Sequence, residues 1–513
     1  MTQQPGATDD ERFAAAINAC RNGGILFVPA GTYRLKQPLV LPHLTTLRGA
    51  GTEKTRIEWT EDPKDGKGQS LPLIQGADLP KPGDFDRRAS FSLEDLSLLS
   101  GPAFTGNLIE RASTSVPAHF RRVAARVPRQ TFEGNRKETE GVVLHLVRAR
   151  NTEITGCDWD AFSVIILLKE VSHLRCTDSH IRWRGLYLWL MRNHNNILFA
   201  HNRVTMAGTF SGNGYTEAMN PNPGLSVAGY DNSNCRGLYY AHNVTDREEA
   251  EPPHRSIGIT FDGATAVYAG RVKSIDGTKL SLAGPTIGPD QYNHPPCDPG
   301  ASVRIVSGRG AGQWRYLVSK PTTKVTEIEV DRPWDVEPDA DSWLAVSNVL
   351  GRTLFVGNKF SNDALLQTYF NTEDVVFAEN AVGVPGRHVS MPVWADAGLN
   401  AWHYQVLDNQ VGEQGVSADC AQPGWNPAKD YAGPITGTHV YRNNRATDAA
   451  ARFVIRIPSR IIGFLLEHNQ GMAGIETRDV KDALGVLRQN TSLKGAILQP
   501  DVPATQKNIV VAP

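Results

Sequence analysis

Short segments of alternating apolar residues that end near an asparagine recur along the chain, and their spacing constrains the fold more than any other feature. The segments are ILFAHNRV (197–204), LYYAHNVT (238–245), VVFAENAV (375–382), YQVLDNQV (404–411) and LLEHNQGM (465–472). The asparagines lie at positions 202, 243, 358, 380, 409, 444, 469 and 490, and several steps between them are 21 to 25 residues. Cys157 and Ser179 continue this register toward Asn202, at steps of 22 and 23 residues.

A period of about 20 to 50 residues is typical of a solenoid, and strand-like alternation inside each repeat predicts a β-solenoid. Longer steps of 41 and 29 residues fit one coil with an outer loop. An asparagine at the turn between strands can bond the matching amide of the next coil, and it tolerates the left-handed conformation of sharp turns. We therefore interpret these asparagines as structural rather than catalytic.

The start of the chain predicts a helix that covers the first coil. Thr8 and Glu11 have the spacing of a capping box. One apolar helix face follows, at Phe13, Ala16, Ile17 and Cys20. Because a solenoid exposes an apolar end that must be covered, we expect residues 1–24 to form an N-terminal cap.

The asparagine repeat disappears between residues 259 and 347, where short strands alternate with turn residues. The strands are expected at 267–275, 279–282, 302–306, 313–318 and 326–330. This pattern predicts a small antiparallel β module inserted between coils. The predicted organisation is the capping helix (1–24), the first part of the β-helix (25–258), the inserted module (259–347) and the last coils (348–513).

The charge of the chain is balanced, with 53 lysines and arginines against 54 aspartates and glutamates. No basic field is therefore present to attract nucleic acid or an anionic membrane, and an anionic polymer would need a local basic patch. No apolar run approaches the roughly 20 residues of a membrane span, and residues 1–10 do not form a signal peptide. We expect an extracellular or periplasmic protein whose signal has been removed, or a cytoplasmic one, as a monomer or a homo-oligomer.

Several motifs of the opening and of the inserted segment resemble those of known proteins. They are Val28–Tyr33 (VPAGTY), Leu47–Thr52 (LRGAGT), Tyr268–Val272 (YAGRV), Ser307–Arg315 (SGRGAGQWR), Arg332–Trp334 (RPW) and Pro338–Asp339. With the first two motifs the chain resembles the pectin-lyase-like β-helix proteins, which include phage tailspikes and bacterial polysaccharide-degrading enzymes. The motifs of the inserted segment resemble a module of poorly characterised bacterial β-helix proteins. The resemblance covers nearly the whole chain and implies an all-β, right-handed parallel β-helix that meets a carbohydrate polymer or oligosaccharide. It leaves the reaction open, because this fold carries lyases, hydrolases, epimerases and binders.

Motifs of the better-known members are missing from the sequence. Neither the Asn-Thr-Asp, Gly-His-Gly and Arg-Ile-Lys set of polygalacturonases nor the Tyr-Gly-Phe-Asp-Pro-His type motif of alginate epimerases is present. Arg456–Arg460 (RIPSR) is one residue too short for the Arg-x-Pro-x-x-Arg element of pectate lyases. The six cysteines (20, 157, 176, 235, 297 and 420) have no metal-site spacing, and no aspartate run matches a Ca²⁺ loop. We expect no cofactor, although carboxylates of distant coils could assemble a Ca²⁺ site.

Two stretches rich in aromatic and polar residues are candidates for the walls of a polymer-binding groove. The predicted substrate-binding residues are Arg184, Tyr187, Trp189, Arg192, His194, Tyr230 and Arg255 in the first stretch, and Gln367, Tyr369 and Trp394 in the second. Flat aromatic rings suit the C–H faces of sugars, polar side chains suit hydroxyl groups, and arginines can pair with uronate or sulfate groups.

Glycoside hydrolysis, the first-choice reaction, needs two carboxyl groups, one protonated and one ionised. The candidates are Asp262, Glu217, Asp231 and Asp246. Asp262 comes first, because it follows an apolar strand at the handover to the inserted module, where burial could tune its pKa. The competing interpretation of Asp262 is a turn residue, since Asp-Gly starts tight turns. Glu217 and Asp246 could instead be solvated loop carboxylates.

Two other functions remain open. A polysaccharide lyase would need a base, for which Tyr187 or His194 could serve, and a cation, for which Arg184 or Arg192 could serve. His194 could instead belong to a turn at a coil corner. A non-catalytic, tailspike-like carbohydrate binder is the third possibility, and the short segment after Asn490 favours an enzyme over it.

Overall fold

The structure is a computed structural model of the 513-residue chain. It describes the sequence except residues 1–6, 82, 129–140, 162–163, 184–185, 192, 207–224, 229–233, 248–258, 263–265, 284–298, 319–326, 361–365, 370–371, 383–392, 395–400, 412–415, 420–437, 447–451, 457–462, 472–473, 479–483, 489–490, 493–496, 499–509 and 512–513.

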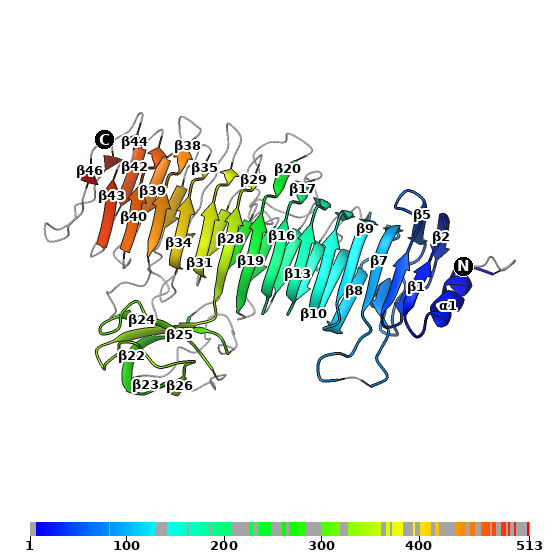
Figure 1. The fold of residues 1–513 in the computed structure, drawn as a ribbon, viewed down its shortest axis with the longest axis horizontal. Coiled ribbons are helices and arrows are strands. Elements are labelled where there is room, and N and C mark those ends of the chain that lie inside the picture. The colour runs from blue at the N-terminus through cyan, green and yellow to red at the C-terminus, as the bar shows by residue number, and fades with distance from the viewer. Residues whose placement is uncertain are drawn as a thin grey trace. The chain divides into compact units, whose positions relative to one another are not determined.

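Parallel strands of successive coils stack on one another, and the fold is the predicted right-handed parallel β-helix (Figure 1). The chain divides into two compact units. One is Met1–Ser226 with Tyr239–His254, and the other is Val227–Leu238 with Arg255–Pro513. The strands fall into three sets by their place in a coil: the first set precedes the ladder position, the second follows it, and the third completes the coil.

In the first unit, the first set is β1 (Gly24–Phe27), β4 (Thr45–Arg48), β7 (Phe91–Leu99), β9 (Ala118–Val127), β10 (Val142–Thr155), β13 (Ser172–Thr177) and β16 (Asn195–Ala200). The second set is β2 (Gly31–Leu35), β5 (Thr55–Trp59), β11 (Asp158–Ala161), β14 (His180–Trp183), β17 (Arg203–Met206) and β20 (Val244–Arg247). The third set is β3 (Leu39–Leu41), β6 (Ile74–Gly76), β8 (Asn107–Thr114), β12 (Val164–Lys169) and β15 (Leu186–Met191). The long strands β7 and β9 continue into the second set, and β10 begins in the third.

In the second unit, the first set is β28 (Leu350–Val356), β31 (Thr372–Ala378), β34 (Ala401–Leu407), β37 (His439–Arg442), β40 (Gly463–Glu467), β43 (Leu484–Arg488) and β46 (Val510–Val511). The second set is β29 (Lys359–Phe360), β32 (Ala381–Val382), β35 (Gln410–Val411), β38 (Arg445–Ala446), β41 (Gln470–Gly471) and β44 (Thr491–Ser492). The third set is β21 (Ile259–Asp262), β30 (Leu366–Tyr369), β33 (Val393–Trp394), β36 (Val416–Asp419), β39 (Arg452–Arg456), β42 (Gly474–Arg478) and β45 (Ile497–Leu498). The division between the units falls within β18 (Leu225–Ala228) and β19 (Cys235–Ala241).

The asparagine ladder is confirmed. The Asn380 side chain donates to Asn409 Oδ1 at 3.0 Å and to the Phe355 carbonyl at 2.9 Å, while its backbone N–H also donates to Asn409 Oδ1 at 2.9 Å. Upstream, the Ser179 N–H donates to Asn202 Oδ1, and the Cys157 N–H donates to Ser179 Oγ. The bond from one side-chain amide to the next recurs from Asn202 to Asn243, from Asn358 to Asn380, from Asn409 to Asn444 and from Asn444 to Asn469. Asn490 lies outside the described residues.

One detail of the ladder differs from the prediction. The left-handed conformation belongs to the residue before the asparagine, at His201, His242, Glu379, Asp408, Asn443 and His468, with φ between 53° and 57°. The asparagine itself points inward and is at most 2% exposed. The two tasks are therefore divided, because a side chain that bonds both neighbouring coils must point into the corner while the preceding residue makes the turn.

The N-terminal cap is confirmed as helix α1 (Asp9–Ala19), with Thr8 as N-cap and Glu11 completing the capping box. Phe13 is 1% exposed and packs edge-on against the Tyr33 ring. The helix also satisfies the open edge of the first coil. Asp9 Oδ2 accepts the Arg34 N–H of β2 at 2.7 Å, and Asp10 accepts the N–H groups of Lys36 and Gln37, which directly follow β2.

The inserted module is confirmed as an antiparallel sheet in the order β25-β24-β27-β22-β23-β26. Its strands are β22 (Ala266–Asp276), β23 (Lys279–Leu282), β24 (Ser302–Ser307), β25 (Trp314–Tyr316), β26 (Glu327–Glu329) and β27 (Trp343–Ser347). It has its own apolar core, which includes Leu280, Val303, Ile305 and Leu344. Residues 259–262 form β21, which pairs in parallel with β30, so the antiparallel strands begin at Ala266 rather than at residue 259.

Candidate functional site

The structure describes the predicted site residues to different extents. Six lie outside the described residues: Arg184, Arg192, Glu217, Tyr230, Asp231 and Arg255. Six others have a described backbone position in a third-set strand: Tyr187 and Trp189 in β15, Asp262 in β21, Gln367 and Tyr369 in β30, and Trp394 in β33. Asp246 and His194 are described with their side chains.

Three predicted residues from distant parts of the sequence occupy one register position on successive strands. Asp262 of β21 is the register partner of Tyr369 of β30, and Tyr369 is the partner of Trp394 of β33. Gln367 of β30 is in turn the partner of Thr260. The third set of strands therefore aligns a carboxylate-bearing residue with two aromatic residues along the direction in which the coils stack.

Asp246 and His194, the two candidates whose side chains are described, lie in surroundings that do not favour a role in catalysis or substrate binding. Asp246 Oδ2 accepts bonds from the Arg203 guanidinium at 2.9 and 3.2 Å, so its carboxylate is held in an ion pair on the second-set strands. His194 is 2% exposed, and this burial lowers the pKa of its imidazole to about 3. A buried, neutral ring is not presented to a polymer, which disfavours His194 as the base of a lyase.

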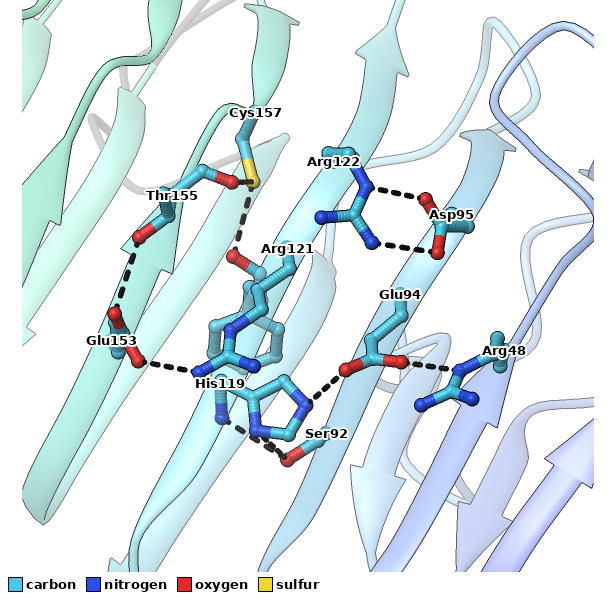
Figure 2. A network of polar contacts seen from close by, with 11 residues as sticks. Arg48, Ser92, Glu94, Asp95, His119, Arg121, Arg122, Glu153, Thr155 and Cys157 are labelled. Carbon is cyan, nitrogen blue, oxygen red and sulfur yellow. Dashed lines mark hydrogen bonds and ion pairs between the residues drawn. The ribbon is translucent and has the colours of Figure 1, made fainter.

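A polar network covers the first-set strands of the first unit (Figure 2). His119 Nε2 lies 2.7 Å from Glu94 Oε1, and His119 Nδ1 lies 3.3 Å from Ser92 Oγ. Arg48 bonds the other oxygen of Glu94. Burial alone would raise the pKa of Glu94, but the bonds from Arg48 and His119 outweigh it and hold the pKa below its ordinary value.

The same network continues as alternating charges on neighbouring strands. Arg121 bonds Glu153 at 2.9 Å, and Arg122 bonds both oxygens of Asp95 at 2.6 and 2.8 Å (Figure 2). Hydrogen bonds from the arginines lower the pKa of Glu153 and of Asp95. Glycosidic cleavage needs one protonated carboxyl group. These ionised, paired carboxylates do not supply it, so the network fits a stabilised outer face.

A second carboxylate and a histidine lie on the third-set strands of the first unit. Asn107 Nδ2 donates to Glu110 Oε2 at 2.9 Å, and His145 Nδ1 lies 3.3 Å from the same oxygen. Burial raises the pKa of Glu110, but the contacts with His145 and Asn107 lower it by more than burial raises it. The pKa of Glu110 therefore lies below its ordinary value. Glu110 and His145 share the register row that continues through Leu167 to Trp189. No motif in the sequence singles out this pair.

The strongest cluster of charges lies where the inserted module meets the coils of the second unit. Glu373 of β31 accepts bonds from Arg304 of β24 and, at 3.3 Å, from Arg236 of β19. Arg304 is 1% exposed and Glu373 is 3% exposed. Burial raises the pKa of Glu373, but the two guanidinium groups outweigh it and keep the pKa low. Trp402 packs beneath Arg304, with 5.4 Å from the guanidinium carbon to the ring centre.

Asp374 is the neighbour of Glu373, and its carboxyl group has the opposite shift. Burial and the charge of Glu373 raise its pKa, the only upward carboxyl shift resolved among the described residues. Arg352, Asp374 and His403 occupy one register position on β28, β31 and β34. All three have left-handed backbone, with φ of 50°, 51° and 56°. Asp374 therefore combines a fixed position with a carboxyl group that retains its proton to higher pH.

The sequence contains a weak indication that Glu373 and Asp374 have a special role. Glu373 and Asp374 interrupt an apolar repeat segment (TEDVVFA), and charged residues inside such a segment need partners when they are buried. The partners Arg236 and Arg304 are 137 and 69 residues away from Glu373, so no local spacing joins them.

A pocket of about 350 Å³ lies in the inserted module, and none of the predicted site residues lines it. Its walls include Ser274, Arg309, Glu337 and Asp339. Among the described residues, no group of three histidine, cysteine, aspartate or glutamate side chains could hold a metal ion. In that same part of the chain, no helix is long and apolar enough to cross a bilayer.

No family model matches the chain, and no curated protein matches it. Among solved structures, it is similar to the A-module of mannuronan C-5 epimerase AlgE6 from Azotobacter vinelandii, with 12% identity over 98% of this chain and 96% of that one and a TM-score of 0.43. It is also similar to the Streptococcus pneumoniae surface protein and adhesin PfbA, with 10% identity, 99% and 97% coverage and a TM-score of 0.38.

A third similar structure is the catalytic unit of the thermostable GH87 α-1,3-glucanase from Streptomyces thermodiastaticus strain HF3-3. The identity is 12% over 97% of this chain and 71% of that one, with a TM-score of 0.30. The three similar structures are thus those of an epimerase, an adhesin and a glucanase, which do not share one activity.

Proposed function

We propose that this protein is an enzyme that cleaves glycosidic bonds in a carbohydrate polymer, acting as a glycoside hydrolase through Asp262 of the third-set strand β21 and Asp374 of the first-set strand β31. The observation that carries the proposal is the shared register position of Asp262, Tyr369 and Trp394. Neighbouring strands lie about 4.8 Å apart, so these three backbone positions are spaced one per coil along the direction in which a polymer would lie across the coils. Aromatic residues in that row suit sugar rings, and the aspartate suits acid or base chemistry.

We propose Asp374, which lies where the inserted module meets the coils, as the second carboxyl group of the reaction. Burial and the charge of Glu373 raise the pKa of Asp374, which is the direction that favours a general acid, while an ionised partner must activate water or attack the sugar. Asp262 is proposed as that partner, with Glu217 and Asp231 as the other sequence candidates. Asp246 is set aside for this role, because Arg203 already holds its carboxylate.

A lyase and a binder are the alternative functions. The burial of His194 leaves Tyr187 as the base of a lyase, with Arg184 or Arg192 as the cation. A binder would use the same row of aromatic residues without the carboxyl groups. Both alternatives predict that substitution of Asp262 or Asp374 leaves any activity unchanged.

The test is incubation of the full chain with neutral, uronic-acid and sulfated polysaccharides, followed by assay of new reducing ends and of the ultraviolet absorbance of unsaturated uronates. Asp262→Asn and Asp374→Asn are each expected to lower turnover by about 10²–10⁴-fold, the usual contribution of acid–base catalysis. Asp276→Asn is the matched control, because Asp276-Gly277 is also an Asp-Gly pair but forms a hairpin turn in the module. Its turnover should equal that of the wild type.

The outcomes separate the three functions. Reducing ends without the absorbance, lost in both variants, support the hydrolase. Both signals together indicate a lyase, and binding without either signal indicates a binder. Full turnover of folded Asp262→Asn and Asp374→Asn would remove these residues from the site.

A further inference from the structure

Four side chains, two of them exposed and two partly buried, lie in contact with one another where the inserted module meets β28. The rings of Trp314 and Tyr316 lie 4.9 Å apart on β25. The Arg332 guanidinium carbon lies 5.6 Å from the Trp314 ring centre. Arg352 of β28 lies 5.7 Å from the Tyr316 ring centre, and its Nη2 donates to the Tyr316 hydroxyl at 2.9 Å. We name these four residues the aromatic–arginine surface.

The alternation of β25 explains why both rings are on the same side. Successive side chains of a strand point to opposite faces. Arg315, between the two rings, is 2% exposed, donates to the Pro333 carbonyl and pairs with Asp335 at 3.1 Å. Trp314 and Tyr316 on the other face are only partly buried. The module therefore places its arginine inward and its two aromatic rings outward.

The two arginines of this surface differ from those below it. Arg236 and Arg304 both form ion pairs with Glu373. Arg332 and Arg352 are exposed, and no described carboxylate forms an ion pair with either of them. Arg352 is the register neighbour of Asp374 and still makes no ion pair with it. Their charges are thus available to a ligand.

The geometry points to a binding site for an anionic sugar polymer on the aromatic–arginine surface. A sugar ring would stack on Trp314, while Arg332 and Arg352 would bond its carboxylate or sulfate groups. The net charge of the chain is close to zero, so this local patch is what would select an anionic polymer. The inference rests on the proposed function in naming the substrate class, although binding is measured without cleavage.

The test uses two matched pairs of polymers and the full chain. Polygalacturonate is compared with its fully methyl-esterified form, and dextran sulfate is compared with dextran, by isothermal titration calorimetry. The variants are Trp314→Ala, Arg332→Gln and Arg352→Gln. Arg271→Gln is the control, because Arg271 is an exposed arginine of the same module that already pairs with Asp341 at 3.4 Å. A thermal melt of each variant confirms that it folds.

We expect the wild type to bind a charged polymer at least about 10-fold more tightly than its uncharged form, and the affinity to fall with added salt. Each of the three variants should weaken binding about 10-fold, and Arg271→Gln should not. The pair that shows the difference identifies carboxylate or sulfate as the recognised group. Equal binding of charged and uncharged polymers, or unchanged binding by the three variants, would overturn the inference. Binding that survives in Asp262→Asn, with no cleavage by the wild type, would instead contradict the proposed function alone.

Discussion

His194 is a histidine whose ring has almost no access to solvent, and this burial has a consequence for stability. Its folded pKa of about 3 is far below the value of about 6.5 for an unfolded histidine. The unfolded chain therefore binds a proton that the folded chain does not, as the pH falls below about 6.5. We predict that the free energy of unfolding of the wild type falls between about pH 7.5 and pH 5, and that His194→Leu loses this part of the decrease.

Denaturant unfolding of both proteins at the two pH values measures the effect. The comparison of slopes with pH matters, rather than the stability at one pH, because leucine also changes the packing. Parallel pH dependence in wild type and His194→Leu would show that the imidazole is protonated in the folded chain.

Single residues were predicted well where their role follows from local sequence, and poorly where it depends on distant coils. His201 and His242 directly precede ladder asparagines in the sequence, a position that favours a structural role, and their rings stack at 5.1 Å. Asp374 gave no such signal, because its raised pKa comes from burial and from Glu373 beside a module that is inserted elsewhere in the sequence.

At the scale of the elements, the ladder is the repeated unit of stability. Asn409 donates to the Phe377 carbonyl and to Asn444 Oδ1, and its Oδ1 accepts from the backbone and side chain of Asn380. We predict that Asn409→Ala lowers the free energy of unfolding by about 2–4 kcal/mol, since buried polar groups left without partners cost about 1–3 kcal/mol each. Gln410→Ala, at the exposed next position, should change it by less than about 0.5 kcal/mol.

Thermal and denaturant unfolding measure this difference, and a similar loss in the two variants would mean that the ladder bonds add little. A second transition in Asn409→Ala alone would be consistent with the ladder account, because a solenoid can lose cooperativity where one coil is weakened.

The elements were predictable to the extent that they repeat. Period and alternation predicted the coils, the capping box predicted α1, and turn residues predicted five strands of the inserted module. The strand β27 and the parallel pairing of β21 were not predicted, because both depend on partners far away in the sequence. For the same reason the row of Asp262, Tyr369 and Trp394 becomes visible only when the strands are paired.

At the scale of the whole molecule, the proposed function requires that the inserted module stays attached to the coils that carry Asp374. A buried ion pair adds little net stability compared with apolar residues, but removal of one partner leaves a buried charge that costs about 3–5 kcal/mol. Glu373 compensates both Arg304 and Arg236. We predict that Glu373→Gln destabilises the second unit by about this amount and lets the module unfold or detach before the coils.

Limited proteolysis and calorimetry test this prediction directly. In Glu373→Gln we expect faster cleavage between residues 266 and 347 and a separate, earlier transition for the module. The double variant Arg304→Met with Glu373→Leu should recover most of the loss, because it removes both buried charges while Arg236 can remain stacked on Tyr316. If Glu373→Gln melts and digests as the wild type does, the ion pairs do not hold the module. The aromatic–arginine surface would then have to be positioned by the packing of Trp402 against Val306 and Ala345 instead.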